Sequence, residues 1–281
     1  MYNIKYVRSD GLELDMGYAA GYVVASVDGA TGHSTTVSTA QGYEQLGETV
    51  QGVATGGKQI SMYGYILDQQ TDRKKALLRA FLPNTHGKLI WESKYSIDVY
   101  VTEAPVVTQT RHSKFSMAFF APYPMWQSTT ESFFQLGGIT GGFQFPVNYA
   151  TPHTFGTTTA QTQFNAKNGG DLAADFKLTI RAGSSALTNF GLQNVHTLQK
   201  ISFTGTLAAD EYIEVYKDAG QIYVRKNGAT DAFDMLDDDA TLFELDAGDN
   251  VLLFTADAGA GAATVFIAFS ETFVGVLADG V

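Results

Sequence analysis

The segment Gly52–Gln59, with the sequence GVATGGKQ, is similar to a phosphate-binding P-loop. A P-loop needs a Ser or Thr after its lysine to hold Mg²⁺, and a helix whose N-terminus faces the phosphates. Here Gln59 follows Lys58, and the residues after it alternate as they do in a strand. We therefore predict a glycine hairpin between two strands, and we expect no nucleotide cofactor.

A group of carboxylates in the C-terminal half has the oxygen ligands that Ca²⁺ prefers. Their spacing is not that of an EF-hand, and the glycine of its sharp turn is missing. A solvated acidic loop without a metal is therefore predicted. The carboxylates are Asp231, Asp234, Asp237, Asp238, Asp239 and Glu244.

The sequence shows no recognisable arrangement of residues for metal binding, nucleophilic catalysis or hydrolysis. The chain has no cysteine, and no two histidines have metal-ligand spacing or form a nucleophile–base arrangement. A hydrolase would need two carboxylates facing each other across a cleft, and no pair stands out among the 29 acidic residues. Trp91 and Trp126 could stack on a sugar, but isolated tryptophans more often belong to a core or an interface. We predict no catalytic residue, no cofactor and no metal, and a protein that is not an enzyme. The histidines are His33, His86, His112, His153 and His196.

Composition limits the classes of protein further. The 281 residues are 44% hydrophobic and 17% charged, which suits a folded protein with a sizeable core. Residues 1–130 carry 11 Lys+Arg against 11 Asp+Glu, whereas residues 131–281 carry 7 against 18, so the second half holds the whole net charge of -11. Neither half has the basic surface that nucleic acids require. No signal peptide or membrane span is expected, so the protein is expected to be made in a cytoplasm.

The first half, residues 1–130, is predicted to be a β domain with one helix. Gln59–Leu67 alternates as a half-buried strand does. The helix is predicted at about 71–82, with Thr71 as its N-cap and Pro83 after its end. Its apolar stripe is made by two pairs spaced four residues apart, and the residues of these pairs are Leu77, Phe81, Leu78 and Leu82.

One segment of this half is too polar to fold alone. Ala30–Gly47 is dominated by Thr, Ser, Gly and Gln, so it can bury little apolar surface. It is therefore predicted to be either a loop or a protruding β-hairpin that a partner completes. From their polarity and β-propensity, the contact residues of such an arm are predicted to be Ser34, Thr35, Thr36 and Val37.

The second half, residues 131–281, is predicted to be a β-sandwich. The segment Ala121–Trp126 holds two prolines two positions apart, which exclude a central strand and indicate a domain boundary. From Asn168 onward, short strands recur at regular spacing between glycine-rich turns, as in a jelly roll. The predicted strands include Phe176–Ala182 and Thr241–Leu245.

The order of several motifs resembles the distal tail protein family of long-tailed, non-contractile phages. In the first half the resemblance rests on the strand Ile60–Leu67, the basic helix start Thr71–Leu78 and the aromatic–proline exit Phe119–Trp126. In the second half it rests on Asn168–Asp171, Glu211–Val215 and Asp246–Val251. Together these motifs extend over nearly the whole chain.

The resemblance implies a structural protein of a phage or prophage tail tip. Its first domain would be a tail-tube-type β-sandwich or barrel that forms a homo-hexameric ring, and its second a galectin-like sandwich around the ring. The partners implied are the tail tube protein, a tail-associated hub or lysin protein and receptor-binding proteins. The protein would be located in the virion.

A second hypothesis is a carbohydrate-binding module, in which the second domain binds cell-surface or cell-wall glycans. Tyr212, Tyr216 and Tyr223 would have to lie exposed on one sheet face, although alternation of this kind is also what a core demands.

Overall fold

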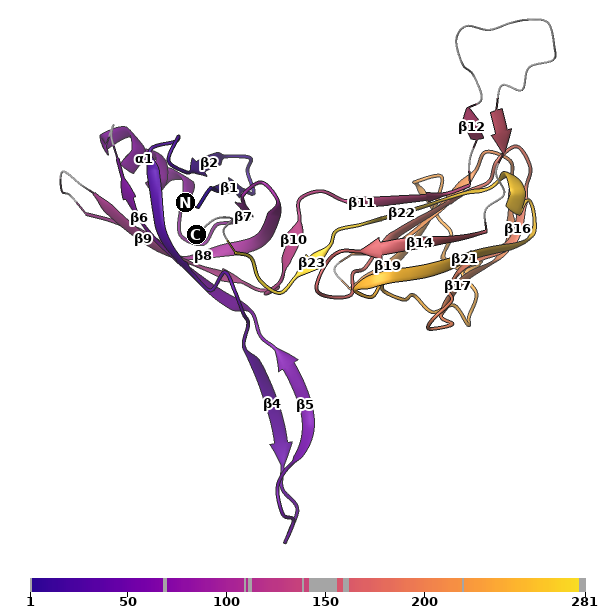
Figure 1. Ribbon diagram of the computed structural model, residues 1–281, viewed down its shortest axis with the longest axis horizontal. Helices are drawn as coiled ribbons and strands as arrows, with labels where there is room; N and C mark the ends of the chain where they lie inside the picture. Colours follow the sequence, from indigo (N-terminus) through magenta and orange to yellow (C-terminus); the bar gives the residue numbers. More distant parts are fainter. Residues whose placement is uncertain are drawn as a thin grey trace, which may run out of the picture. The chain divides into compact units, whose positions relative to one another are not determined.

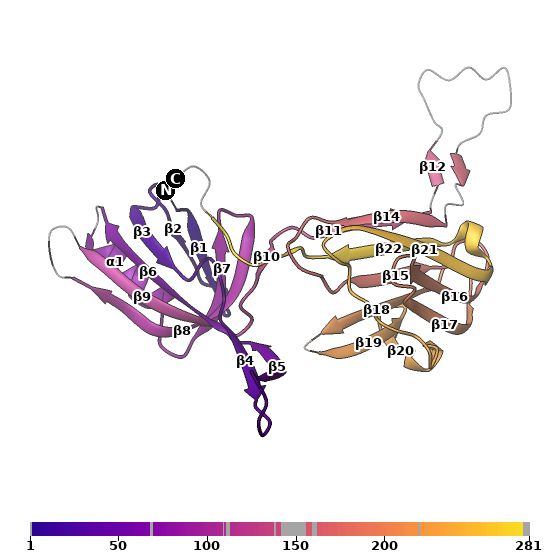
Figure 2. The same cartoon turned by 60° about the horizontal axis from the view of Figure 1, so that its bottom comes forward.

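The computed structural model describes residues 2–67, 70–108, 110, 113–137, 139–141, 156–158, 162–218 and 220–277. The chain divides into two compact units (Figures 1 and 2). The first consists of Met1–Thr130 together with Thr272–Val281, and the second of Glu131–Glu271. The predicted second domain, 131–281, therefore has to be corrected at its C-terminal end, because β23 (Thr272–Phe273) pairs with a strand of the first unit. No helix of the described residues is long and apolar enough to cross a membrane.

The first unit is built on one antiparallel sheet with the strand order β2-β1-β7-β8-β9-β6-β3. In addition, β10 pairs with β8, and β23 pairs with β10. Its main strands are β1 (Ile4–Arg8), β2 (Glu13–Met16), β3 (Tyr22–Asp28), β6 (Lys58–Ile66), β7 (His86–Trp91), β8 (Tyr95–Val107), β9 (Lys114–Ala121) and β10 (Trp126–Ser128). The predicted alternation of β6 is present, since Ile60 and Met62 are buried.

The helix α1 (Gln70–Ala80) lies close to the predicted range of 71–82. Leu77 and Phe81 are fully buried, and the Phe81 ring lies 4.5 Å from Tyr6 and 5.4 Å from Phe119. The prediction that Leu78 and Leu82 share this stripe is wrong, because both are nearly half exposed. The helix therefore buries only a narrow stripe. Leu77 and Phe81, the residue directly after the helix, pack this stripe into the core of the first unit.

The second unit is a sandwich of a six-stranded and a four-stranded antiparallel sheet. The larger sheet has the order β11 (Ser132–Leu136), β22 (Thr264–Phe269), β15 (Lys177–Arg181), β18 (Tyr212–Asp218), β19 (Gln221–Lys226) and β20 (Thr230–Asp231). The smaller has the order β14 (Gln163–Asn168), β21 (Gly248–Ala258), β16 (Leu187–Asn194) and β17 (Lys200–Leu207). Outside these sheets lie the short pair β12 (Ile139–Gly141) and β13 (Gly156–Thr158) and the 3₁₀ turns Phe233–Met235 and Ala260–Ala262.

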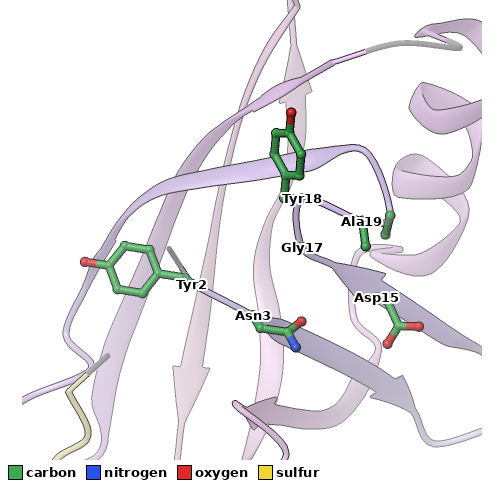
Figure 3. Close-up of a pocket in the computed structure, with 7 residues that line it drawn as sticks. Tyr2, Asn3, Asp15, Gly17, Tyr18 and Ala19 are labelled. Carbon is green, nitrogen blue, oxygen red and sulfur yellow. The ribbon is translucent and has the colours of Figure 1, made fainter. Parts of the chain in front are cut away.

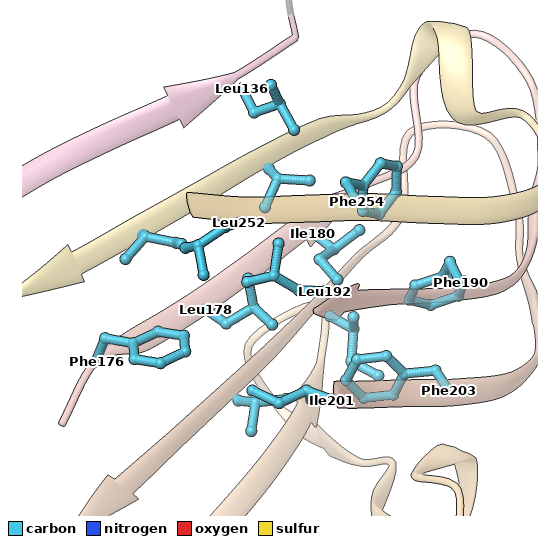
Figure 4. Packing of buried hydrophobic residues seen from close by; sticks show 14 of the residues in the cluster. Leu136, Phe176, Leu178, Ile180, Phe190, Leu192, Ile201, Phe203, Leu252 and Phe254 are labelled. Carbon is cyan, nitrogen blue, oxygen red and sulfur yellow. The ribbon is translucent and has the colours of Figure 1, made fainter. Parts of the chain in front are cut away.

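Alternate residues of both sheets meet in the core of this sandwich (Figure 4). Leu178 and Ile180 come from the larger sheet, and the stacked rings of Phe190 and Phe203 come from the smaller one, with centroids 5.1 Å apart. Burial of one residue in two along strands such as β15 and β22 is the pattern expected of two packed sheets. The predicted class, all-β with a single helix, is confirmed.

Two details of the predicted sandwich differ from the structure. Thr241–Leu245 was predicted as a strand, but of these residues only Leu245 is bridged, to Ala174, and it lies outside the named strands. Conversely, β16 is an inner strand of the smaller sheet and was not predicted from the sequence. Its register shifts between Thr188 and Phe190, where Asn189 has a φ of 43°, and this bulge interrupts the alternation on which strand prediction relies.

Buried asparagines hold the turns of the second unit. The side chain of Asn250 accepts the Asp246 N–H at 3.0 Å and donates to the carbonyls of Asp246 and Gly248 at 2.8 and 3.3 Å. Asn168 donates to the carbonyls of Leu172 and Leu245, both at 2.9 Å. Each side-chain amide therefore forms hydrogen bonds with backbone groups of the turn that would otherwise have no partner.

We expect Asn250→Ala to lower the free energy of unfolding by about 2 kcal/mol, because the turn loses three hydrogen bonds at a buried position. Asn165→Ala is the matched control and should cost less than about 1 kcal/mol, since Asn165 makes a single exposed bond to Asp249. Chemical denaturation followed by circular dichroism measures both, because the two tryptophans lie in the first unit and do not report on this one. Equal losses in the two variants would contradict the role assigned to Asn250.

Candidate functional site

The most unusual feature of the first unit is a two-stranded arm, β4 (Thr35–Ala40) paired with β5 (Thr49–Thr55). Figures 1 and 2 both show it projecting away from the sheet of the unit. Every residue of β5 is exposed, and so is every residue of β4 except the last. An isolated two-stranded hairpin is marginally stable at best in water, so the arm has the properties of a segment that a partner stabilises.

The arm has two different faces. Val37 and Val53 are cross-strand partners, and the register places Val50 on the same face. Their exposed fractions are 51%, 65% and 57%. The opposite face carries small residues such as Ser38 and its partner Gly52. The arm therefore presents a valine stripe that is unusual for an exposed strand and suits contact with another protein surface.

The turn at the tip of the arm is held by Gln45. Its side-chain oxygen accepts the Gly42 N–H at 2.9 Å, and its amide donates to Thr49 Oγ1 at 2.8 Å. The turn presents Tyr43 and Leu46, whose exposed fractions are 95% and 103%. Two large apolar side chains are thus displayed on a turn whose backbone is already ordered.

The predicted contact residues lie at the base of this arm. The Ser34 carbonyl accepts the Gly56 N–H at 3.2 Å, and Thr35 pairs with Thr55. Thr35 and Val37 belong to the valine face, and Thr36 to the opposite one. The prediction of a protruding hairpin agrees with the structure, whereas the role of these four residues in contacts stays a prediction. Val50 and Val53 were not predicted as part of this face. They are three residues apart in the sequence and share a face only because the register shifts between Ser38 and Thr39.

The predicted glycine hairpin at Gly52–Gln59 is wrong. Gly52 lies inside β5, and after Gly56 and Gly57 the chain enters β6. The two strands do not pair with each other, because β5 pairs with β4 and β6 pairs with β3 and β9. The glycines therefore mark the place where the arm joins the sheet.

Lys58, the first residue of β6, is buried where the arm ends. Its side chain is 6% exposed, and its Nζ has no hydrogen-bond partner within the described residues. The Nζ lies 5.8 Å from the centroid of the Trp126 ring, which gives it only a cation–π contact. Burial lowers the pKa of Lys58 to about 8.

An open cleft of about 640 Å³ lies beside β2 (Figure 3). Its lining includes the rings of Tyr2 and Tyr18, the polar side chains of Asn3 and Asp15, and Ala19. It lacks a nucleophile–base arrangement, and within the described residues no group of His, Cys, Asp or Glu could hold a metal ion.

The acidic residues from Asp231 to Glu244 are likewise not grouped as metal ligands. Of the histidines, His33, His86 and His196 are exposed at separate places, and His112 and His153 lie outside the described residues. Trp91 and Trp126 are buried in the core of the first unit, as predicted.

The tyrosines that the glycan hypothesis requires lie on the outer face of the larger sheet. Tyr216 and Tyr223 stack with ring centroids 5.3 Å apart. The Nζ of Lys177 lies 5.5 Å from the Tyr216 centroid, and Arg225 lies 5.7 Å from that of Tyr223. Because neighbouring side chains occupy these ring faces, the pair offers little surface on which a sugar could stack.

Residues 169–273 match the family described as siphovirus-type tail component, C-terminal domain. Over 97% of this chain and 99% of the other, the fold is similar to that of the SPP1 Dit protein, with a TM-score of 0.69 and 13% sequence identity. That protein is described as a paradigm of the hub adsorption apparatus in phages that infect Gram-positive bacteria. Chains of the phage P2 baseplate, solved in its activated conformation with Ca and with Sr, give TM-scores of 0.48 and 0.49 at 12% identity. No curated protein matches.

The chain is therefore similar to siphovirus-type tail components, by sequence over residues 169–273 and by fold over nearly its whole length. The resemblance to the distal tail protein family is confirmed, by sequence in the second unit and by fold over nearly the whole chain.

We expect Lys58→Met to stabilise the first unit at pH 7, by up to about 3 kcal/mol. In the wild type, the folded chain releases the Lys58 proton near pH 8, whereas the unfolded chain holds it until about pH 10.5. The unfolded state therefore binds more protons in this range, and the free energy of unfolding rises from pH 8 toward 10.5. The variant should lack this rise.

Tryptophan fluorescence during chemical denaturation at pH 7, 8 and 9.5 measures this difference, because both tryptophans lie in the first unit. Tyr6 and Tyr22, whose pKa values burial raises, titrate in both proteins and cancel in the comparison. Lys88→Met, at an exposed lysine 3.8 Å from Asp98, is the control and should change stability by less than about 0.5 kcal/mol. A wild type and a Lys58→Met variant with the same pH dependence would contradict the burial of an ammonium group.

Proposed function

We propose that this chain is a structural, non-enzymatic component of a phage or prophage tail, the distal hub that links the tail tube to the receptor-binding apparatus. In this proposal six copies form a ring through their first units, and the second units surround it. The ring contacts the tail tube protein, a tail-associated hub or lysin protein and the receptor-binding proteins. The protein is made in the cytoplasm of a bacterial host and ends in the virion.

The observation that carries the proposal is the fold shared with the SPP1 Dit protein along nearly the full length of both chains. The arm supports it independently, because its exposed valine face requires a partner surface. An arm that contacts a different surface on the next copy makes a head-to-tail interface, and such interfaces form rings when the rotation between copies closes. The acidic surface of the second half suits a solvated periphery.

Glycan binding by the second unit is the alternative. This alternative needs aromatic ring faces that are free to stack on a sugar. The rings of Tyr216 and Tyr223 instead stack on each other, with Lys177 and Arg225 beside them. We therefore retain the tail-hub function.

The proposal is tested by the solution mass of the purified protein, measured by light scattering behind a sizing column over a range of concentrations. A species of six times the chain mass of 30.3 kDa, alone or in equilibrium with monomer, supports the ring. A monomer at every concentration would count against self-assembly and would favour the glycan alternative.

In the same measurement, Val37→Asp and Val53→Asp should each weaken assembly at least tenfold, because a charge on the valine stripe would be desolvated in the contact. The stability of the separate chain should change by less than about 0.5 kcal/mol, since both positions are exposed. Ser38→Asp adds the same charge to the opposite face of the same strand and serves as the control. Undiminished assembly of Val37→Asp would show that the valine face is not the contact.

A further inference from the structure

The tip of the arm is a ready-made anchor for a binding site. Tyr43 and Leu46 are fully exposed, and the hydrogen bonds of Gln45 already order the turn that carries them. Binding through such a turn costs little conformational entropy. Tyrosine is also among the residues that most often dominate the energy of protein interfaces.

The cleft of Figure 3 is equally preformed. The Tyr2 ring is held edge-on against Trp91, with centroids 5.2 Å apart. The turn that carries Tyr18 is closed by the N–H groups of Ala20 and Tyr22, which both donate to the Gly17 carbonyl. The side chain of Asn3 covers Gly17, where a Cβ atom would lie 2.9 Å from its Oδ1. The walls of the cleft are therefore in place before any partner arrives.

The chemistry of the cleft matches that of the tip. Asp15 is exposed and lies opposite Lys5 in the pairing of β1 with β2, but the Lys5 ammonium pairs with Glu13, so the Asp15 carboxylate can accept the phenol O–H of Tyr43. The rings of Tyr2 and Tyr18 offer faces for an aromatic group, and Ala19 and Ala20 offer a small apolar surface for Leu46. The volume of about 640 Å³ lies within the range of pockets that enclose a group of this size.

A second copy of this chain is the occupant that the arm and the cleft indicate. Tyr43 and Leu46 do not occupy the cleft of their own chain, because both are fully exposed. The arm from 35 to 55 has 21 residues, about the number that one partner contributes to a standard protein interface. Tip and cleft are different surfaces of one chain, so their contact is head-to-tail.

We propose that the arm tip of one copy binds in the Tyr2–Tyr18 cleft of the next, with Tyr43 and Leu46 as anchors and Asp15 as the acceptor for the Tyr43 hydroxyl. This docking rests on the proposed ring and names the two surfaces that join its subunits.

Cross-linking tests the contact without ambiguity, because the chain has no cysteine. Two differently tagged variants, Leu46→Cys and Ala19→Cys, are mixed and treated with a short bismaleimide. The expected product is a cross-linked pair carrying both tags. Leu46→Cys mixed with Leu78→Cys, at a comparably exposed position on α1, is the control and should give much less. Equal products from the two mixtures, or none from the first, overturn the docking.

Cross-linking of the double variant Leu46→Cys/Ala19→Cys distinguishes a head-to-tail ring from a mutual exchange of arms between two copies. A head-to-tail ring gives a ladder of cross-linked species that ends at six chains, whereas a mutual exchange of arms stops at two and overturns the ring-forming contact.

Affinity gives a second readout. Tyr43→Ala and Leu46→Ala should each weaken association about thirtyfold, as interface anchors do. Tyr43→Phe and Asp15→Asn should each weaken it about tenfold, and the combined variant no further than either one. Full association of Tyr43→Ala together with Leu46→Ala overturns the docking but leaves the ring intact. A wild type that does not associate, together with cysteine variants that give no cross-linked pair, overturns both.

Discussion

The carbonyl of Ala30 accepts two hydrogen bonds, from Trp126 Nε1 at 2.9 Å and from the Val276 N–H at 3.3 Å. Ala30 precedes the arm, Trp126 begins the strand that leads toward the second unit, and Val276 follows the strand that returns from it. One buried acceptor therefore holds together three segments that are far apart in the sequence. The base of the arm depends on this point, because Trp126 also packs on Lys58, where the arm ends.

This arrangement buries Lys58, which is energetically unfavourable. A buried ammonium without a hydrogen bond is unfavourable, and a cation–π contact offsets only part of that cost. The two strands of the arm leave the sheet from this cluster and bury almost nothing of their own. The first unit thus has a buried base from which a segment extends that buries almost none of its own surface. The second unit is self-sufficient by comparison, with a continuous core between its two sheets and asparagines that hold its turns.

Sequence patterns were informative where structure is local. The helix is recognisable because its caps and the pair Leu77/Phe81 lie within a few turns of each other, and β6 is recognisable because alternation marks its buried face. The arm was recognisable from its polarity, although the predicted segment Ala30–Gly47 ends before the second strand, β5. Strand β16 was missed because the bulge at Asn189 and the glycine at 191 disturb the alternation of an inner strand. Gly191 is required there by a neighbouring backbone, since a Cβ atom would lie 2.7 Å from the Ile201 carbonyl oxygen.

The fold class, an all-β chain with one helix, and the presence of a polar arm can be predicted from the sequence. These properties follow from composition and from spacings of two to four residues, which set which side of an element is buried. Three features could not be predicted in this way: β23 belongs to the first unit, Lys58 is buried, and Tyr2 and Asp15 share a cleft with Tyr18. Each of these features depends on pairing or packing between distant segments, and no local pattern encodes which distant residue becomes a neighbour.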